Sequence, residues 1–145
     1  MFWKSTGTGR FSKRRGVNSP PMQTPIENDY LRLWLEEDIL CAYFKQENLD
    51  ITAARKAVQL RMDHFNDRSY LFLIDISMTK HMTDEAKQFL ASSQATRYIW
   101  AGAFLGMSYI SCVIGNLFLY VFKPTIPSKL FTDREEARLW LLQHK

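Results

Sequence analysis

The first clear pattern in the chain is an alternation of leucine with polar or aromatic residues over positions 30–35. A period of two residues is typical of a β-strand with one buried face. Residues 36–38 are all acidic and predict a turn, and the apolar run 39–44 predicts a second strand. We therefore expect the folded part of the chain to begin with a β-hairpin.

The next segment has the spacing of an amphipathic helix. Asp50 lies where an N-cap is expected, because its carboxylate can accept a hydrogen bond from the free N–H groups of the first turn. Apolar residues then recur at helical spacing: Ile51, Ala54, Val58, Met62 and Phe65. We expect this helix to end near residues 66–67 and to pack through that stripe.

Three further elements follow along the chain. Residues 70–76 are almost continuously apolar, as in a central strand that is buried on both faces. Thr83 is placed to cap a second helix, and Asp84 and Glu85 fall in its first turn, where the helix dipole favours acids. Residues 99–105 predict another strand.

The C-terminal part supplies two helices and a strand. Residues 108–122 predict a helix that stops at the Lys-Pro pair 123–124. Residues 129–131 predict a short strand, and Thr132 and Glu135 match the capping-box pattern of a final helix. The predicted order is β-β-α-β-α-β-α-β-α, which indicates an α/β fold with a mixed, mainly parallel sheet and covering helices.

Residues 98–122 contain no charged side chain and are long enough to span a bilayer. They also contain Gly102 and Gly106 in the spacing of a membrane-helix packing motif. These glycines interrupt the apolar stretch, however, and a strand, a turn and the helix 108–122 explain the same residues. We therefore expect no transmembrane helix.

The predicted helix 108–122 is apolar on every side in its second half. Such a helix is surrounded by protein, or it faces a ligand, a membrane surface or a second subunit. The side chains that we expect to contact an apolar ligand or partner are Trp100, Phe104, Phe118 and Phe122.

Charge and composition divide the chain into two parts. The 145 residues are 46% hydrophobic, enough for one domain with a sizeable core. Residues 1–25 carry five basic residues and no acid, so the remainder holds 19 − 5 = 14 basic and 15 acidic residues. We expect 1–25 to be a disordered basic tail before a domain at 26–145, or an extension of the gene model with Met22 as the true start.

The same composition argues against several classes of protein. The nearly neutral body shows no basic face for nucleic acid, although the basic run 12–15 could contact anionic lipid or RNA. The tail lacks the apolar segment of a secretory signal. Cys41 and Cys112 have no metal-site or redox-pair spacing, so we expect reduced, buried thiols and no cofactor. A cytoplasmic protein, at most peripheral at the membrane, fits these features.

Polar side chains gather after the strand at 70–76, at the edge of the sheet where open α/β folds place ligands. This polar loop comprises Asp75, Ser77, Lys80, His81, Thr83 and Asp84. Lys80 and His81 beside a helix N-terminus could hold an anion. The loop has no nucleophile elbow, metal-ligand spacing or glycine-rich phosphate cradle, so we expect no catalysis there.

Three strings together resemble the uncharacterised bacterial STAS-like proteins, relatives of the SpoIIAA-like proteins. They are the strand and its end at 70–77, the helix start at 83–87, and the strand and helix at 129–141. The resemblance covers residues 26–145 and implies the same α/β layout. It also implies similarity to the lipid-binding CRAL-TRIO-type folds.

In phosphorylatable STAS domains, the strand ending in aspartate leads to an Asp-Ser-Ser-Gly turn that receives a phosphate. The resemblance assigns Asp75 to the strand end and aligns the turn with residues 83–86, which read Thr-Asp-Glu-Ala. Both serines and the glycine are missing. We therefore expect no serine phosphoswitch, although Thr83 could still accept a phosphate.

These features predict a non-catalytic binding or regulatory module for an apolar ligand, a membrane surface or a partner protein. A homodimeric protein–protein scaffold sealed by the helix 108–122 is the first alternative. An enzyme with an unrecognised site in the loop 77–83 is the second. The identity of the protein partner or lipid-like ligand does not follow from the sequence.

Overall fold

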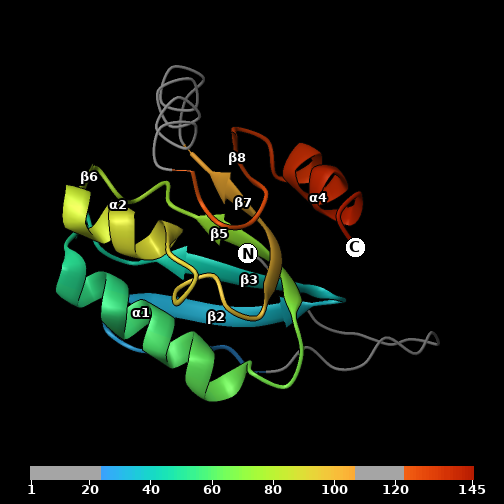
Figure 1. Cartoon of the computed structure of the whole chain (residues 1–145). Coiled ribbons are helices and arrows are strands. Elements are labelled where there is room, and N and C mark those ends of the chain that lie inside the picture. The colour runs from blue at the N-terminus through green and yellow to red at the C-terminus, as the bar shows by residue number, and fades with distance from the viewer. Residues whose placement is uncertain (1–23, 107–122) are drawn as a thin grey trace.

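The computed structural model describes residues 24–106 and 123–145. Its central sheet has six strands in the order β1-β2-β3-β5-β7-β8, and β4 pairs with β6 in a small second sheet (Figure 1). The elements are β1 (Ile26–Glu27), β2 (Leu31–Glu36), β3 (Ile39–Phe44), β4 (Asn48–Leu49), α1 (Ile51–His64), β5 (Tyr70–Asp75), β6 (His81–Met82), α2 (Asp84–Ala91), β7 (Ile99–Leu105), β8 (Ser128–Phe131) and α4 (Arg134–Leu142).

The sheet is mixed and mainly parallel, as predicted. β1, β2 and β3 pair antiparallel, whereas β3, β5, β7 and β8 pair parallel. The hairpin of β2 and β3 and the strands at β5 and β7 lie where the hydrophobic pattern predicts them. The short strands β1, β4 and β6 were not predicted, because two residues carry no readable period.

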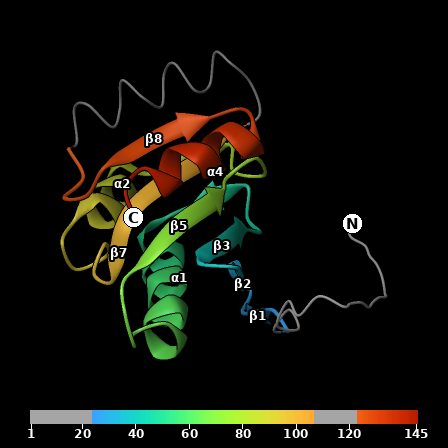
Figure 2. The same ribbon diagram turned by 90° about the vertical axis from the view of Figure 1, so that its right-hand side faces the viewer.

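Helices cover both faces of the sheet (Figure 2). α1 and α2 lie on one face and share a core with β2, β3 and β5, whereas α4 packs on the other face against β3, β5 and β7. β5 lies between β3 and β7 and has five consecutive buried residues. Its continuous apolar sequence follows from this burial on both faces.

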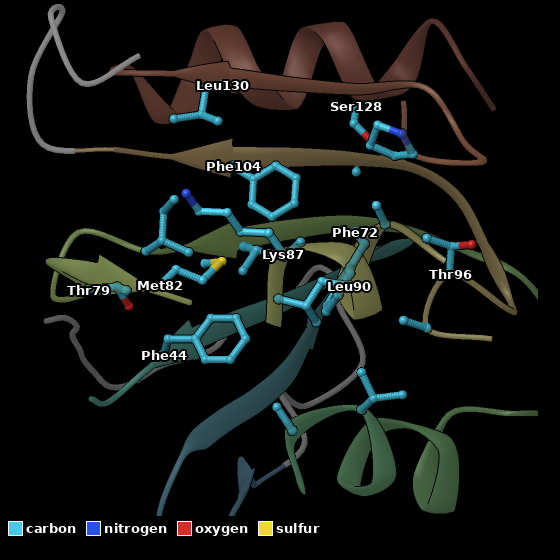
Figure 3. A pocket seen from close by; sticks show the side chains of 18 of the residues that line it. Phe44, Phe72, Thr79, Met82, Lys87, Leu90, Thr96, Phe104, Ser128 and Leu130 are labelled. Atoms are coloured by element: carbon cyan, nitrogen blue, oxygen red, sulfur yellow. The ribbon is translucent and has the colours of Figure 1, made fainter. Parts of the chain in front are cut away.

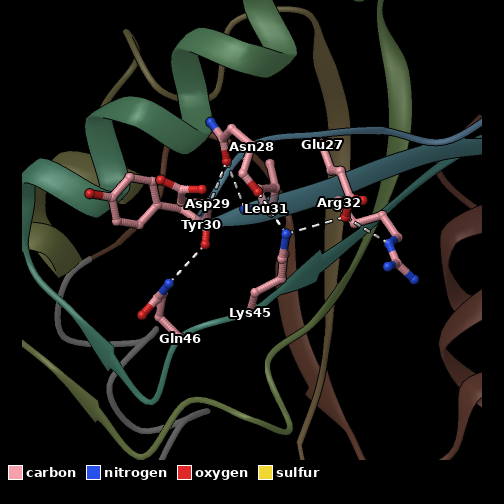
Figure 4. Close-up of polar contacts among 8 residues, drawn as sticks. All are labelled: Glu27, Asn28, Asp29, Tyr30, Leu31, Arg32, Lys45 and Gln46. Atoms are coloured by element: carbon pink, nitrogen blue, oxygen red, sulfur yellow. Dashed lines mark hydrogen bonds and ion pairs between the residues drawn. The ribbon is translucent and has the colours of Figure 1, made fainter.

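The edge of the sheet at β1 is fixed by polar side chains (Figure 4). The Asn28 side chain accepts hydrogen bonds from the backbone N–H groups of Tyr30 and Leu31 at 2.8 and 2.9 Å. Lys45, which directly follows β3, donates to the carbonyl of Asn28 at 2.8 Å and to Glu27 at 3.2 Å. Side chains therefore stabilise a strand that is too short to be held by its ladder alone.

α1 packs through a different face from the one predicted. The side chains that it buries are Ala53, Ala54, Ala57 and Arg61. Ala54 and Phe65 of the predicted stripe are buried, but Ile51, Val58 and Met62 are only half-buried. Alanine side chains let a helix approach a sheet closely, so the larger residues flank the contact instead of filling it.

The helix starts confirm two of the three predicted caps. Asp50 accepts a hydrogen bond from Ala53 N at 2.9 Å, and Thr83 accepts one from Ala86 N at 3.1 Å. In α4 the cap is Asp133, not Thr132, and its carboxylate accepts from the backbone N–H three residues later at 2.9 Å. The capping box predicted at Thr132 is therefore wrong by one residue.

Replacing Asp133 with alanine is expected to lower the free energy of unfolding by about 1 kcal/mol, the usual cost of losing an N-cap. Thr132→Ala is the matched control and is expected to change it by only a few tenths of a kcal/mol, since Thr132 is exposed and does not cap the helix. Urea unfolding of both variants measures the difference. If both variants lost the same free energy of unfolding, Thr132 would contribute to the cap as much as Asp133 does.

A β-bulge displaces one residue of β7. Ile99 pairs with Tyr70 and Ala101 pairs with Leu71, so Trp100 is the extra residue between them. Trp100 is 57% exposed, and the strand then regains its alternation between the two faces of the sheet. The bulge decides which side chains of β7 reach each core.

Three expectations concern residues outside the described ranges: residues 1–23 of the predicted tail 1–25, the helix 108–122 with its assembly or membrane role, and the thiol of Cys112. Cys41 lies in β3 and is buried with a free thiol, as predicted. In the part of the chain that the structure describes, none of the helices has the length and apolar character needed to cross a bilayer.

Candidate functional site

A pocket of about 580 Å³ lies between the central sheet and the helices α1 and α2 (Figure 3). Most of its described lining is aliphatic or aromatic. These apolar side chains are Leu31, Phe44, Ala57, Val58, Phe72, Ile74, Ile76, Met82, Leu90, Ala91, Ala95, Ile99, Phe104, Pro124, Ile126 and Leu130. The pocket is of the size and character of small-molecule binding sites.

Small residues on the two sides of this pocket leave space that larger side chains would fill. Ala57 faces it from α1, and Gly102 faces it from the middle of β7. A Cβ atom built on Gly102 would lie 3.8 Å from Ile126 Cδ1 and 3.9 Å from Phe104 Cε2, which are ordinary contact distances. The missing side chain at this position thus contributes directly to the volume of the pocket.

Only some residues of the predicted polar loop line the pocket. Ser77, Lys80 and His81 line it, together with Thr79. Thr79 Oγ1 donates to the carbonyl of Gln46 at 3.2 Å, and Lys80 forms an exposed ion pair of 3.0 Å with a neighbouring glutamate. These residues come from the loop after β5 and from β6, so polar groups gather at one end of the pocket.

The other residues of the predicted loop have local roles and do not line the pocket. Asp75 accepts a hydrogen bond from the backbone N–H of Ser77 at 2.9 Å and so shapes the turn after β5. Thr83 caps α2, and Asp84 forms an ion pair of 3.8 Å with Lys87 within the helix. The structure thus gives Thr83 the capping role expected from the sequence.

The four predicted apolar contact residues also have different positions. Phe104 lines the pocket from β7, where the alternation of the strand after the bulge points it to the same side as Gly102 (Figure 3). Trp100, the bulged residue, is exposed and does not line the pocket. Phe118 and Phe122 lie outside the described residues.

Arg61 is a pocket residue that the sequence pattern does not predict. It lines the pocket, and only 2% of it is exposed. Its guanidinium donates to the carbonyls of Ala95 and Arg97 at 2.6 and 2.8 Å and lies over the ring of Phe72, 5.6 Å from its centroid. Desolvation lowers its pKa to about 10, so it remains charged at neutral pH. Its position one turn after Ala57 is the signal that could have found it.

Among residues 24–106 and 123–145, the charged side chains that line the pocket are all basic: Arg61, Lys80 and Lys87. All 15 acidic residues of the chain fall within the described ranges, and none of them lines the pocket. Two of the three cations are paired with exposed acids, Lys80 at 3.0 Å and Lys87 at 3.8 Å. The pocket therefore has an apolar wall and a positive electrostatic character.

The same side chains offer little for catalysis. Within residues 24–106 and 123–145, no group of three or more His, Cys, Asp and Glu side chains could hold a metal ion. The side chain of His81 is exposed, and its backbone N–H donates to the carbonyl of Glu47 at 3.0 Å. The arrangement is suited to holding an apolar molecule.

Comparison with known proteins shows which family and which fold this chain resembles. The model of a family described as a domain of unknown function, DUF7793, matches residues 33–145. The chain is similar to the crystal structure of an uncharacterized protein from the DUF3478 family of Shewanella loihica PV-4, which has a SpoIIAA-like fold. The TM-score is 0.57 with 14% identity, covering 87% of this chain and 99% of that one. Curated proteins gave no match. The SpoIIAA-like fold predicted from the sequence is confirmed.

Proposed function

Since the chain belongs to the DUF7793 family and has a SpoIIAA-like fold, we propose that it is a non-catalytic binding module that takes one lipid-like molecule into its apolar pocket. The observation that carries this proposal is the pocket of about 580 Å³ between the sheet and the helices α1 and α2. Its apolar lining supports binding, and the lack of a convergent catalytic set around His81 among the described residues argues against an enzyme.

The volume of the pocket favours a small molecule over a protein segment. Binding pockets for single small ligands measure roughly 300–1,000 Å³, a range that includes this one. Each 100 Å² of apolar ligand surface removed from water contributes about 2.5 kcal/mol, so even a short hydrocarbon chain gains useful affinity.

Titration with N-phenyl-1-naphthylamine, a neutral apolar fluorophore, tests this proposal. We expect saturable binding of one fluorophore per chain, with a blue-shifted emission because the dye leaves water. Trp100→Ala is the matched control, since Trp100 is a large exposed aromatic that does not line the pocket. Its affinity for the dye is expected to equal that of the wild type.

Two results would contradict the proposed pocket. If the dye bound without saturation, the apolar space would not be a ligand site. If Trp100→Ala lost binding, the exposed face of β7 would be the contact surface instead. Light scattering of each sample, with and without dye, shows whether binding accompanies a change of assembly and so separates the ligand from the homodimer interpretation.

A further inference from the structure

Arg61 carries a buried positive charge that no acidic side chain of the protein neutralises. It is 2% exposed, and its hydrogen bonds go to two backbone carbonyls. All acidic residues lie within the described ranges, and none forms an ion pair with Arg61. A buried charge is costly unless it is paired with an opposite charge or strongly hydrogen-bonded.

The contacts of Arg61 leave part of its binding capacity unused. A guanidinium has five N–H donors, and the carbonyls of Ala95 and Arg97 use two of them. Its Cζ lies 5.6 Å from the ring centroid of Phe72, which is itself part of the pocket wall. A group bound at this wall would therefore meet a planar cation with donors that no atom of residues 24–106 and 123–145 uses.

The other two cations of the pocket are different. Lys80 and Lys87 each have an acidic neighbour, and the side chain of Lys80 is 68% exposed. Exposed charges are screened by water and salt, whereas a charge with little water around it attracts an anion strongly. Arg61 is thus the cation of the pocket best placed to select an anionic group.

We propose that the ligand of the pocket is a single-chain amphiphile with a carboxylate headgroup, which pairs with Arg61 while its hydrocarbon chain lies along the apolar lining. This inference rests on the proposed function and names the class of ligand. The planar fork of a guanidinium matches a carboxylate, and one carboxylate balances the single charge of Arg61. A phosphate monoester would bring a surplus of negative charge to this wall.

Competition against the bound neutral dye tests the headgroup on the unmodified protein. Dodecanoate is expected to displace the dye at a concentration about tenfold or more below that of dodecan-1-ol, which has the same chain but no charge. The preference is expected to persist at high salt, because the pair is buried. Dodecyl phosphate is expected to bind more weakly than dodecanoate.

Variants locate the headgroup. Arg61→Gln is expected to remove the preference for the acid, and Arg61→Lys to keep part of it, since the charge remains but the planar fork is lost. Lys56 is an exposed cation of α1 that does not line the pocket, so Lys56→Gln is the matched control and is expected to keep the full preference. Lys80→Gln compares the exposed cation of the pocket with Arg61. Because Arg61 also holds two loop carbonyls, urea unfolding of each variant shows whether the fold is intact, and the comparison of ligands on the wild type does not depend on it.

The failures of the two proposals are distinguishable. If the dye does not bind, the proposed function is wrong. If the dye binds but the acid and the alcohol displace it equally, the pocket stands and the carboxylate inference is wrong. The inference is also overturned if dodecyl phosphate binds as tightly as dodecanoate, or if Lys80→Gln abolishes the preference while Arg61→Gln retains it.

Discussion

Replacing Gly102 with leucine is expected to weaken dye binding by roughly 5- to 150-fold, the equivalent of about 1–3 kcal/mol, because the new side chain occupies the pocket. Gly102 lies in the middle of β7 with its Cβ direction toward Ile126 and Phe104. The Cβ itself fits at ordinary contact distances, so the atoms beyond it take up the space that a ligand would use.

The size of the side chain gives this prediction an internal control. Gly102→Ala is expected to bind the dye nearly as well as the wild type, and Gly102→Val to fall between alanine and leucine. Glycine weakens a strand relative to residues with side chains, so the three variants are expected to unfold at similar or slightly higher urea concentrations. Unchanged dye affinity in a folded leucine variant would show that the ligand does not occupy the pocket.

Raising the pH above 9 is expected to destabilise the wild type relative to Cys41→Ala by about 1.4 kcal/mol for each pH unit, up to about 4 kcal/mol. Burial beneath α4, with a smaller contribution from the charge of Glu36, raises the pKa of the Cys41 thiol from 9.0 to about 12. Above pH 9 the thiol ionises in the unfolded chain but stays protonated in the folded one. Stability is therefore intact below pH 9 and is lost as the pH rises toward 12.

Urea unfolding of both proteins at pH 8, 9, 10 and about 11 measures this loss. The difference between the wild type and Cys41→Ala cancels the titration of lysine and tyrosine, which both proteins share. Parallel pH profiles would mean that Cys41 is accessible to water in the folded state. That result would contradict the packing of α4 over β3.

The main elements could be predicted because each is long enough to show a clear hydrophobic pattern. The alternation in β2 and the continuous apolar run in β5 placed two strands and identified the central one. The cap of α4 was misplaced because Thr132 and Asp133 are both good capping residues, and the backbone decides between them. The bulge at Trp100 depends on its partner strand, which a single-strand pattern does not reveal.

The pocket could be predicted only in part. Ser77, Lys80 and His81 could be placed together because they follow a strand end, where ligands commonly bind, and all three line the pocket. The apolar interior of the pocket includes space left by the small residues Gly102 and Ala57, and a hydrophobic pattern does not show where volume is missing. Arg61 was assigned to no face because a charged residue is normally exposed.

The most direct test of the ligand pocket is an isotope-filtered nuclear Overhauser measurement on carbon-13-labelled protein saturated with N-phenyl-1-naphthylamine. We predict cross-peaks from the dye to the side chains of Leu90, Phe104 and Ile126, which line the pocket from α2, from β7 and from the segment before β8. Cross-peaks confined to exposed residues such as Trp100 and Leu139, or none to the pocket, would contradict it.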